Sequence, residues 1–488
     1  MKHASSIIRY DEYSLSFAIY GEVDAAIAET ATFLWSLQSS ADPESSLTIS
    51  VREDLRKEFY FDFAALQVEQ LTCILDANPE RSFDLNAGIW SEEKSVVLAT
   101  RPYPLNLKLR YSGPSRGFLF EDGGTAFVDA LEKRQSSFGS LSIAASFDDP
   151  VAHDTDKMPV SRANLKRILE MSGKFEALAF SPLDRDCVLI PFAANVKTLD
   201  YMVDVKFMKP EDFESLVIVP KNLDLTICHD EDESWDELLL SCLKRVAELG
   251  HFETLGIAVD GNWDYNDDDL HDYESVAVVA EALIKVIDRN PNLTSLDISG
   301  SYWLLDWGPQ FKRIFKAMEK HSSLRTFIMV EDCDWESDSD IEDSGDDSTE
   351  CFDYPRYSWL EQLLSRNRNI EVQESSGKRC SNGASIDKLY LLNHFYRGSV
   401  QPVKDTQVTA WRPLLVATAL MESASRNFRF SSLLLFNHTD VLCEFMQDLS
   451  LDERGALQFV SEDSEDLMTP TLPLHQDPMK TKIIRDTN

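Results

Sequence analysis

A short apolar phrase recurs along the middle of the chain and constrains the fold more than any other feature. Each copy has apolar residues at its first, fourth and sixth places. Alternation at the fourth and sixth places suits a strand with one buried face, and strands with the same phrasing are expected to stack in parallel. The copies are Phe138–Ile143, Phe175–Phe180, Phe213–Ile218, Phe252–Ile257, Leu293–Ile298 and Leu324–Met329, with Val196–Tyr201 as an additional candidate.

Between these copies the apolar residues follow a helical period. The first residues of the six copies lie 37, 38, 39, 41 and 31 residues apart, which leaves room for one strand, one helix and two loops per unit. The stretches 239–249, 276–287 and 311–318 each carry one apolar stripe at helical spacing. A strand with one apolar face and a helix with one apolar stripe bury both only when neighbouring units stack, so the pattern predicts a repeat solenoid.

The phrase L-x-x-L-x-L preceded by a helix resembles the leucine-rich repeat, in the helix-bearing variety typified by ribonuclease inhibitor. The resemblance covers roughly residues 63–375 and implies an α/β fold: a curved solenoid of strand-helix repeats with a parallel sheet. The chain departs from this family in two ways. Its repeats are longer than the usual 20 to 29 residues, and the place expected to hold Asn carries Ser146, Asp260, Ser301 or Asp332. A regular asparagine ladder is therefore not expected, and another layered α/β arrangement is the alternative.

Different patterns flank the array. Residues 1–62 contain strand-like runs at 14–20 and 46–51 and a helical stretch at 25–35, which together predict an N-terminal cap. Helical stretches at 386–396, 411–423 and 428–446 predict a C-terminal helical cap over residues 376–450. Residues 451–488 are polar, and we expect a disordered tail there.

The charge of the chain limits its partners. A formal net charge of -37 disfavours nucleic acid and anionic membranes, because both require clustered Lys and Arg. No window has the length and apolar character of a membrane span or a secretory signal, so we expect a cytoplasmic or nuclear protein. The eight cysteines form no C-x-x-C pair, which predicts reduced thiols.

An acidic segment interrupts the array. Residues 331–353 contain twelve Asp or Glu and no Lys or Arg, and we expect a disordered insertion over residues 333–353. It would attract a basic partner, and Ser337, Ser339 and Ser344 are candidate phosphorylation sites because each precedes an acidic residue by three places. The alternative is a solvated loop without a dedicated role.

Motifs for catalysis, metals and cofactors are weak. Asp260 to Asp268 places oxygen ligands at alternate positions, as a calcium loop does, but Tyr265 stands where a turn glycine is needed and His271 where a glutamate is needed. Cys228 and His229 have no second Cys or His at ligand spacing nearby, so a strand end is the better interpretation. The sequence therefore predicts no metal site, no cofactor and no catalytic residue.

The strand positions that face away from the core are expected to form the binding face. Most of them are small, which argues against catalysis on the sheet and favours close packing of a partner or of another chain segment; an idle face of a decaying repeat is the alternative. The candidate partner-binding residues on or beside the strands are Ser142, Thr254, Ser295, Asp297, Ser299 and Thr326.

The leading functional hypothesis is a non-enzymatic, protein-binding scaffold or adaptor whose partner is a protein, with the acidic insertion favouring a basic one. The first alternative is an acidic, chaperone-like binder of basic proteins. The second is an enzyme without a recognisable motif, since catalytic groups can converge from distant positions.

Overall fold

The fold is described from a computed structural model of the chain. The structure describes residues 4–9, 15–20, 24–36, 65–77, 79–80, 82–85, 88–111, 117–145, 158–229, 235–261, 273–301, 307–330, 356–382, 385–391 and 393–394. The chain divides into two units, Met1–Tyr390 and Leu391–Asn488, and the elements below belong to the first. No helix in these ranges is long and apolar enough to cross a membrane.

A parallel sheet of ten strands organises the first unit, and its strands follow one another in chain order from β3 to β14. Two short strands, β4 (Gly88–Trp90) and β6 (Phe118–Phe120), form a separate parallel pair. The ten strands are β3 (Ser82–Leu85), β5 (Leu105–Tyr111), β7 (Gly139–Ala145), β8 (Phe175–Phe180), β9 (Thr198–Asp204), β10 (Asn222–His229), β11 (Thr254–Gly261), β12 (Ser295–Asp297), β13 (Thr326–Met329) and β14 (Glu371–Glu374).

The apolar residue at the fourth place of the phrase forms one continuous row across the sheet. Cross-strand register aligns Leu199 with Leu223, Leu255, Leu296 and Phe327, and each of these side chains is buried. Because strand side chains alternate between faces, the residues between them point to the opposite face and are less buried. The prediction of a parallel sheet with one buried face is confirmed.

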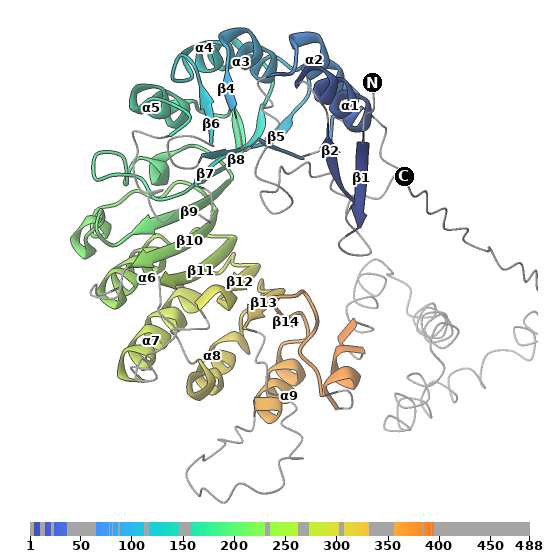
Figure 1. The fold of residues 1–488 in the computed structure, drawn as a ribbon. Helices are drawn as coiled ribbons and strands as arrows, with labels where there is room; N and C mark the ends of the chain where they lie inside the picture. The colour runs from blue at the N-terminus through green and yellow to red at the C-terminus, as the bar shows by residue number, and fades with distance from the viewer. Residues whose placement is uncertain are drawn as a thin grey trace, which may run out of the picture. The chain divides into compact units, whose positions relative to one another are not determined.

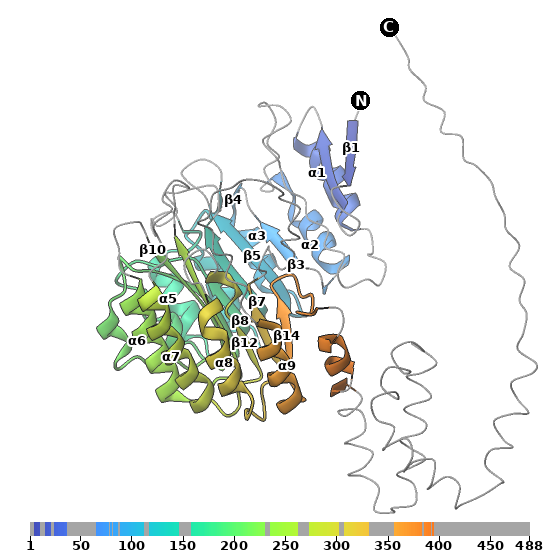
Figure 2. The ribbon, with the colours of Figure 1, turned by 90° about the horizontal axis from the view of Figure 1, so that it is seen from below.

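Helices lie along the buried face of the sheet (Figures 1 and 2). Their apolar stripes are buried at the predicted positions, including Leu243, Leu283 and Ile314. The helices from the start of the sheet onward are α3 (Glu92–Ala99), α4 (Thr125–Lys133), α5 (Arg162–Glu170), α6 (Asp236–Leu249), α7 (Tyr273–Arg289), α8 (Phe311–Met318) and α9 (Arg356–Arg366). The segments before β9 and β10 contain the 3-10 turns η4 (Pro191–Ala193) and η5 (Pro210–Phe213) in place of a helix.

One predicted strand is wrong. Residues 213–218 follow η5 as a loop, and the strand of this unit is β10, which starts at Asn222. Phe213 is nevertheless buried, because it packs against Phe192 with ring centroids 6.0 Å apart. The phrase there is an apolar turn that fills the place of a helix, whereas the additional candidate at 196–201 is confirmed as the start of β9.

Buried asparagines connect the ends of neighbouring helices. Asn290 directly follows α7, and its Nδ2 donates to the carbonyl oxygens of Val286 in α7 (2.9 Å) and Val246 in α6 (3.4 Å). Its Oδ1 accepts from the Phe252 amide at 3.2 Å. One fully buried side chain therefore satisfies backbone groups of two successive units, as the terminal carbonyls of helices require.

The same arrangement continues into the next two units. Nε2 of His321 lies 3.0 Å from the carbonyl oxygen of Asn290, and Nδ2 of Asn367 donates to the carbonyl oxygens of Met318 (2.9 Å) and His321 (3.0 Å). The asparagines thus stand after helices, and not after strands, where Asp260 and Ser301 occupy the expected places.

Strands and helices also flank the sheet. The predicted N-terminal strand and helix are present as β2 (Leu15–Tyr20) and α1 (Asp24–Trp35); β2 pairs antiparallel with β1 (Ala4–Arg9), and α2 (Val68–Ala77) precedes β3. Residues 385–391 are helical, as predicted for the start of the C-terminal helices. The other expectations lie outside the described residues: the run 46–51, the acidic insertion with Ser337, Ser339 and Ser344, the calcium-like loop beyond Gly261, the helices at 411–423 and 428–446, and the tail.

Candidate functional site: the polar face of the sheet

The face of the sheet opposite α3 to α9 is the candidate site, and we call it the polar face. Its residues are those that alternate with the buried row on each strand. The six predicted partner-binding residues fall on it or at its margin. Thr254, Ser295 and Thr326 stand in register on β11, β12 and β13. Ser142 and Asp297 belong to the next row, and Ser299 follows β12 in η6 (Ser299–Ser301).

That next row carries three carboxylates that the sequence did not place together. Register aligns Asp200 on β9 with Asp224 on β10, Asp224 with Gly256 on β11, and Gly256 with Asp297 on β12. The expectation of a nearly uncharged face is therefore wrong in its centre. The reason is the misplaced strand: the positions assigned to Ser215 and Val217 belong to Asn222 and Asp224.

Gly256 gives the carboxylate of Asp224 its room. A Cβ atom on residue 256 would lie 2.5 Å from Oδ1 and 2.8 Å from Cγ of Asp224. The Asp224 side chain therefore occupies the space above β11 that any other residue type would fill. The backbone of Gly256 has an ordinary negative φ, so the glycine serves this close approach and not a turn.

The electrostatics of the row follow from its crowding. Although solvent reaches Asp224, the surrounding strands displace part of its hydration, and this burial together with Asp200 and Asp297 raises its pKa to about 6. Burial also raises the pKa of Asp200, and the charge of Lys108 on β5 opposes that shift. Asp297 accepts hydrogen bonds from the amide (2.9 Å) and hydroxyl (2.7 Å) of Ser299. Like charges are thus held close together on an accessible surface.

A neighbouring row supplies an acceptor without a donor. Asn222 Nδ2 donates to the hydroxyl of Thr198 at 3.2 Å, while its Oδ1 is buried and has no hydrogen-bond partner. A buried acceptor without a partner is costly, and a donor from a ligand would satisfy it. Asn222 and Asp224 alternate with buried residues on β10, so both belong to the polar face.

The carboxyl-terminal ends of the strands hold Cys228 between Asp204 and Asp260 in register. Burial, Asp260 and Asp204 raise the pKa of the Cys228 thiol to about 12, so it stays protonated and is a poor nucleophile. Cys228 and His229 lie at the end of β10, as predicted. Within the described ranges, no three His, Cys, Asp or Glu side chains are arranged to hold a metal ion.

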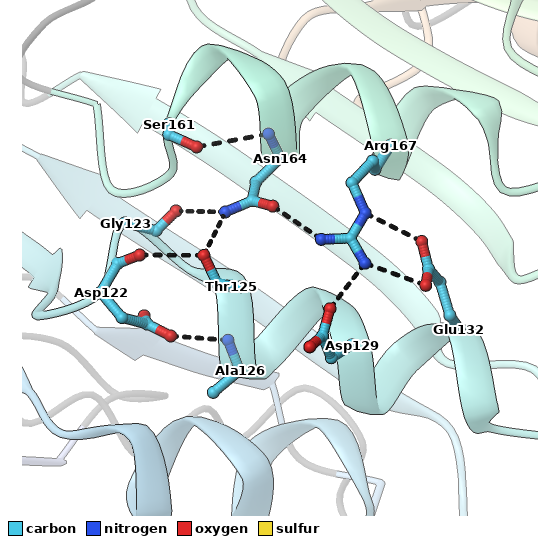
Figure 3. Close-up of polar contacts among 9 residues, drawn as sticks. All are labelled: Asp122, Gly123, Thr125, Ala126, Asp129, Glu132, Ser161, Asn164 and Arg167. Carbon is cyan, nitrogen blue, oxygen red and sulfur yellow. Dashed lines mark hydrogen bonds and ion pairs between the residues drawn. The ribbon is translucent and has the colours of Figure 1, made fainter.

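The polar cluster between α4 and α5 contrasts with this face (Figure 3). Buried Asn164 donates from Nδ2 to the carbonyl oxygen of Gly123 (2.9 Å) and the hydroxyl of Thr125 (3.0 Å), and its Oδ1 accepts from Arg167 (3.0 Å). Arg167 also pairs with Asp129 (2.6 Å) and Glu132 (2.9 Å).

Two caps complete this cluster. Ser161 caps α5 by accepting from the Asn164 amide at 3.3 Å, and Asp122 accepts from the amides of Gly124 and Ala126 at the start of α4. Each of these donors and acceptors is used within the cluster, so the cluster joins two helices and offers little to a ligand. The sequence gave no sign of it, because the residues come from two units.

Comparisons with known proteins add no identity to this geometry. The sequence matches no model of a protein family, and a search of curated proteins found no match.

Proposed function

We propose that the chain is a non-enzymatic protein-binding scaffold, built as a curved, degenerate leucine-rich-repeat solenoid, that binds a protein partner on the polar face. One observation carries the proposal: ten parallel strands in chain order bury one face beneath helices and present accessible polar side chains in register on the other. Repeat proteins commonly bind partners on such extended surfaces.

The repeat spacing supports the leucine-rich-repeat interpretation. The aligned residues Leu178, Leu199 and Leu223 are 21 and 24 residues apart, within the usual range of 20 to 29. The longer units elsewhere carry a full helix. The early comparison with longer repeats depended on the misplaced copy at Phe213.

The absence of enzymatic activity is part of the proposal. Among the described residues of the polar face, the protonated Cys228 thiol is a poor nucleophile. The Ser299 hydroxyl donates to Asp297, and this pair lacks the histidine that would act as general base in a catalytic triad. Nucleic acid is excluded from the proposal because the carboxylate row would repel phosphates.

Affinity capture from lysate tests the proposal. Wild type is compared with a face variant, Thr254→Arg with Ser295→Arg, and with a control that adds two arginines at exposed positions away from the sheet, Ala163→Arg with Asn292→Arg. A scaffold retains one stoichiometric partner in the control and loses it in the face variant. Equal capture by all three proteins, or no specific partner, contradicts the proposal.

The second candidate is an acidic chaperone-like binder of basic proteins, favoured by the net charge of -37 and by the acidic residues of 331–353. Deletion of residues 333–353 distinguishes the two functions. A chaperone loses its basic partners with the deletion and at high salt, whereas a partner packed on the sheet remains bound.

A further inference from the structure

The centre of the polar face offers acceptors and negative charge and lacks matching donors. Asp200 and Asp224 form no ion pair with any side chain in the described ranges, and the Oδ1 atom of Asn222 has no donor. These groups come from β9 and β10, and Asp297 on β12 continues the row. A ligand that fits must bring several hydrogen-bond donors and positive charge.

We propose that this part of the polar face docks a basic, extended segment of a protein partner, whose Lys or Arg side chains pair with Asp200, Asp224 and Asp297. The proposal rests on the proposed scaffold function and deepens it by naming the chemistry of the partner. The buried Oδ1 of Asn222 accepts from the same segment, either from a side chain or from a backbone amide.

The spacing of the row favours a peptide over a single metal ion. Neighbouring strands are separated by about 4.8 Å, so Asp200 and Asp224 are about 5 Å apart at the backbone and Asp297 lies about 10 Å beyond Asp224. One cation with oxygen ligands at about 2.4 Å cannot span that row. An extended segment places side chains of one face about 7 Å apart, a spacing that long Lys and Arg side chains adapt to.

The charges around the row favour a cation further. The raised pKa of Asp224 reflects burial and two nearby carboxylates, and a bound ammonium or guanidinium group relieves that repulsion. Lys108 is the positive side chain that acts on Asp200, and it stands three strands away on β5. The row therefore remains negative before a partner binds.

Glycine at 256 supports the same interpretation, independently of charge. Its missing Cβ leaves the space in which the Asp224 carboxylate lies, directed along the row toward Asp297. A sheet face without a ligand has no need of this close approach, since a side chain at 256 would cover β11.

Fluorescence anisotropy with a labelled peptide in which Lys alternates with Gly tests the proposal, and a matching Glu–Gly peptide is the negative probe. The full chain carries Asp200→Asn, Asp224→Asn and Asp297→Asn together. The control variant removes the same charge from exposed helix positions: Glu92→Gln, Glu93→Gln and Glu170→Gln. Both variants are also made with residues 333–353 deleted, which removes the other acidic binding region.

In both backgrounds we expect the Asn variant to weaken peptide binding at least about tenfold and the Gln control to weaken it less than about threefold at about 100 mM salt. Equal weakening by the two variants overturns the proposal, since binding then follows net charge alone. Unchanged binding overturns it as well. The single variant Asp224→Asn, with an expected loss of about threefold, covers the case in which the triple variant is unfolded.

A photo-crosslinking residue at Thr226, two places from Asp224 on the same face, locates the peptide. It should crosslink to the Lys peptide, whereas the same residue at Ala163 on α5 should not. If a natural partner is lost from the arginine face variant but binds the Asn variant normally, the scaffold function stands and the basic-segment proposal fails. If no partner is captured at all, the scaffold function fails instead.

Discussion

Oδ1 of Asp224 lies 2.5 Å from the point where a Cβ of residue 256 would be, so Gly256 and Asp224 share one space on the polar face. The two residues are also cross-strand partners in register. The carboxylate is held by this relationship beside Asp297 and Asp200, which raises its pKa to about 6 together with burial. A negative row is thereby maintained at a cost to the stability of the unliganded protein.

Asp224→Asn should stabilise the protein at neutral pH. A folded-state pKa above the ordinary value of 3.8 means that ionised Asp224 destabilises the fold above pH 6, and that this penalty disappears as the pH falls toward 4. Because the carboxylate is exposed to solvent, we expect a gain on the order of 1 kcal/mol at about pH 7.5, well below the full linkage value. Urea unfolding of both proteins at about pH 7.5 and 4 measures it. An equal difference at both pH values contradicts the assignment.

Gly256→Ala should weaken binding of the Lys peptide while changing stability by less than about 1 kcal/mol. The added methyl group meets only the end of the flexible Asp224 side chain, which can move. If displacement of that carboxylate is the cause, then Gly256→Ala has no further effect on peptide affinity in an Asp224→Ala background. Additive losses in the double variant would place the effect elsewhere.

The sequence predicted the repeated strands, the helices between them and the parallel sheet, because the apolar period is a local signal. It did not predict the carboxylate row. Asp200 and Asp224 become neighbours only through register, and the apolar turn around Phe213 matched the phrase better than β10 did, since Pro220 occupies the place usually held by an apolar residue. The room beside Gly256 is likewise a property of two strands together.

The asparagine positions failed for a similar reason. A ladder was sought at the places after the strands, where Asp260 and Ser301 stand. The structure satisfies backbone groups at the helix ends with Asn290 and Asn367, which the chain separates by two units. No local pattern marks a side chain that bonds to the carbonyl of a preceding unit.

Asn290→Ala should destabilise the protein by about 2–4 kcal/mol, because it leaves the buried amide of Phe252 and the carbonyl oxygen of Val246 without this partner. Asn292→Ala is the matched control, since Asn292 is exposed two residues further on, and should change stability by less than about 0.5 kcal/mol. Urea unfolding of both variants measures the difference. Similar values for the two would show that the side chain of Asn290 does not join the units.

Tyr390 closes the last edge of the sheet. Its hydroxyl accepts from the Val372 amide at 3.2 Å and donates to the Val372 carbonyl at 3.0 Å, and the Cys380 amide also donates to that carbonyl at 3.0 Å. An exposed edge strand is a template for unwanted pairing, so these bonds shield β14. They also explain why burial raises the pKa of Tyr390 while its backbone bond to Val372 opposes the shift.

Tyr390→Phe should therefore act on one backbone group more than on the other. The Val372 carbonyl keeps its bond from Cys380, whereas the Val372 amide loses the donor interaction with the hydroxyl. We expect hydrogen exchange of the Val372 amide to accelerate about tenfold or more, since each lost kcal/mol of local stability raises exchange severalfold. The Val259 region of β11, at the centre of the sheet, should exchange as in wild type. Equal acceleration in β11 and β14 would mean that the substitution destabilises the whole array and that the edge bond has no local role, whereas unchanged exchange at Val372 would mean that the helix of residues 385–391 does not hold the edge through Tyr390.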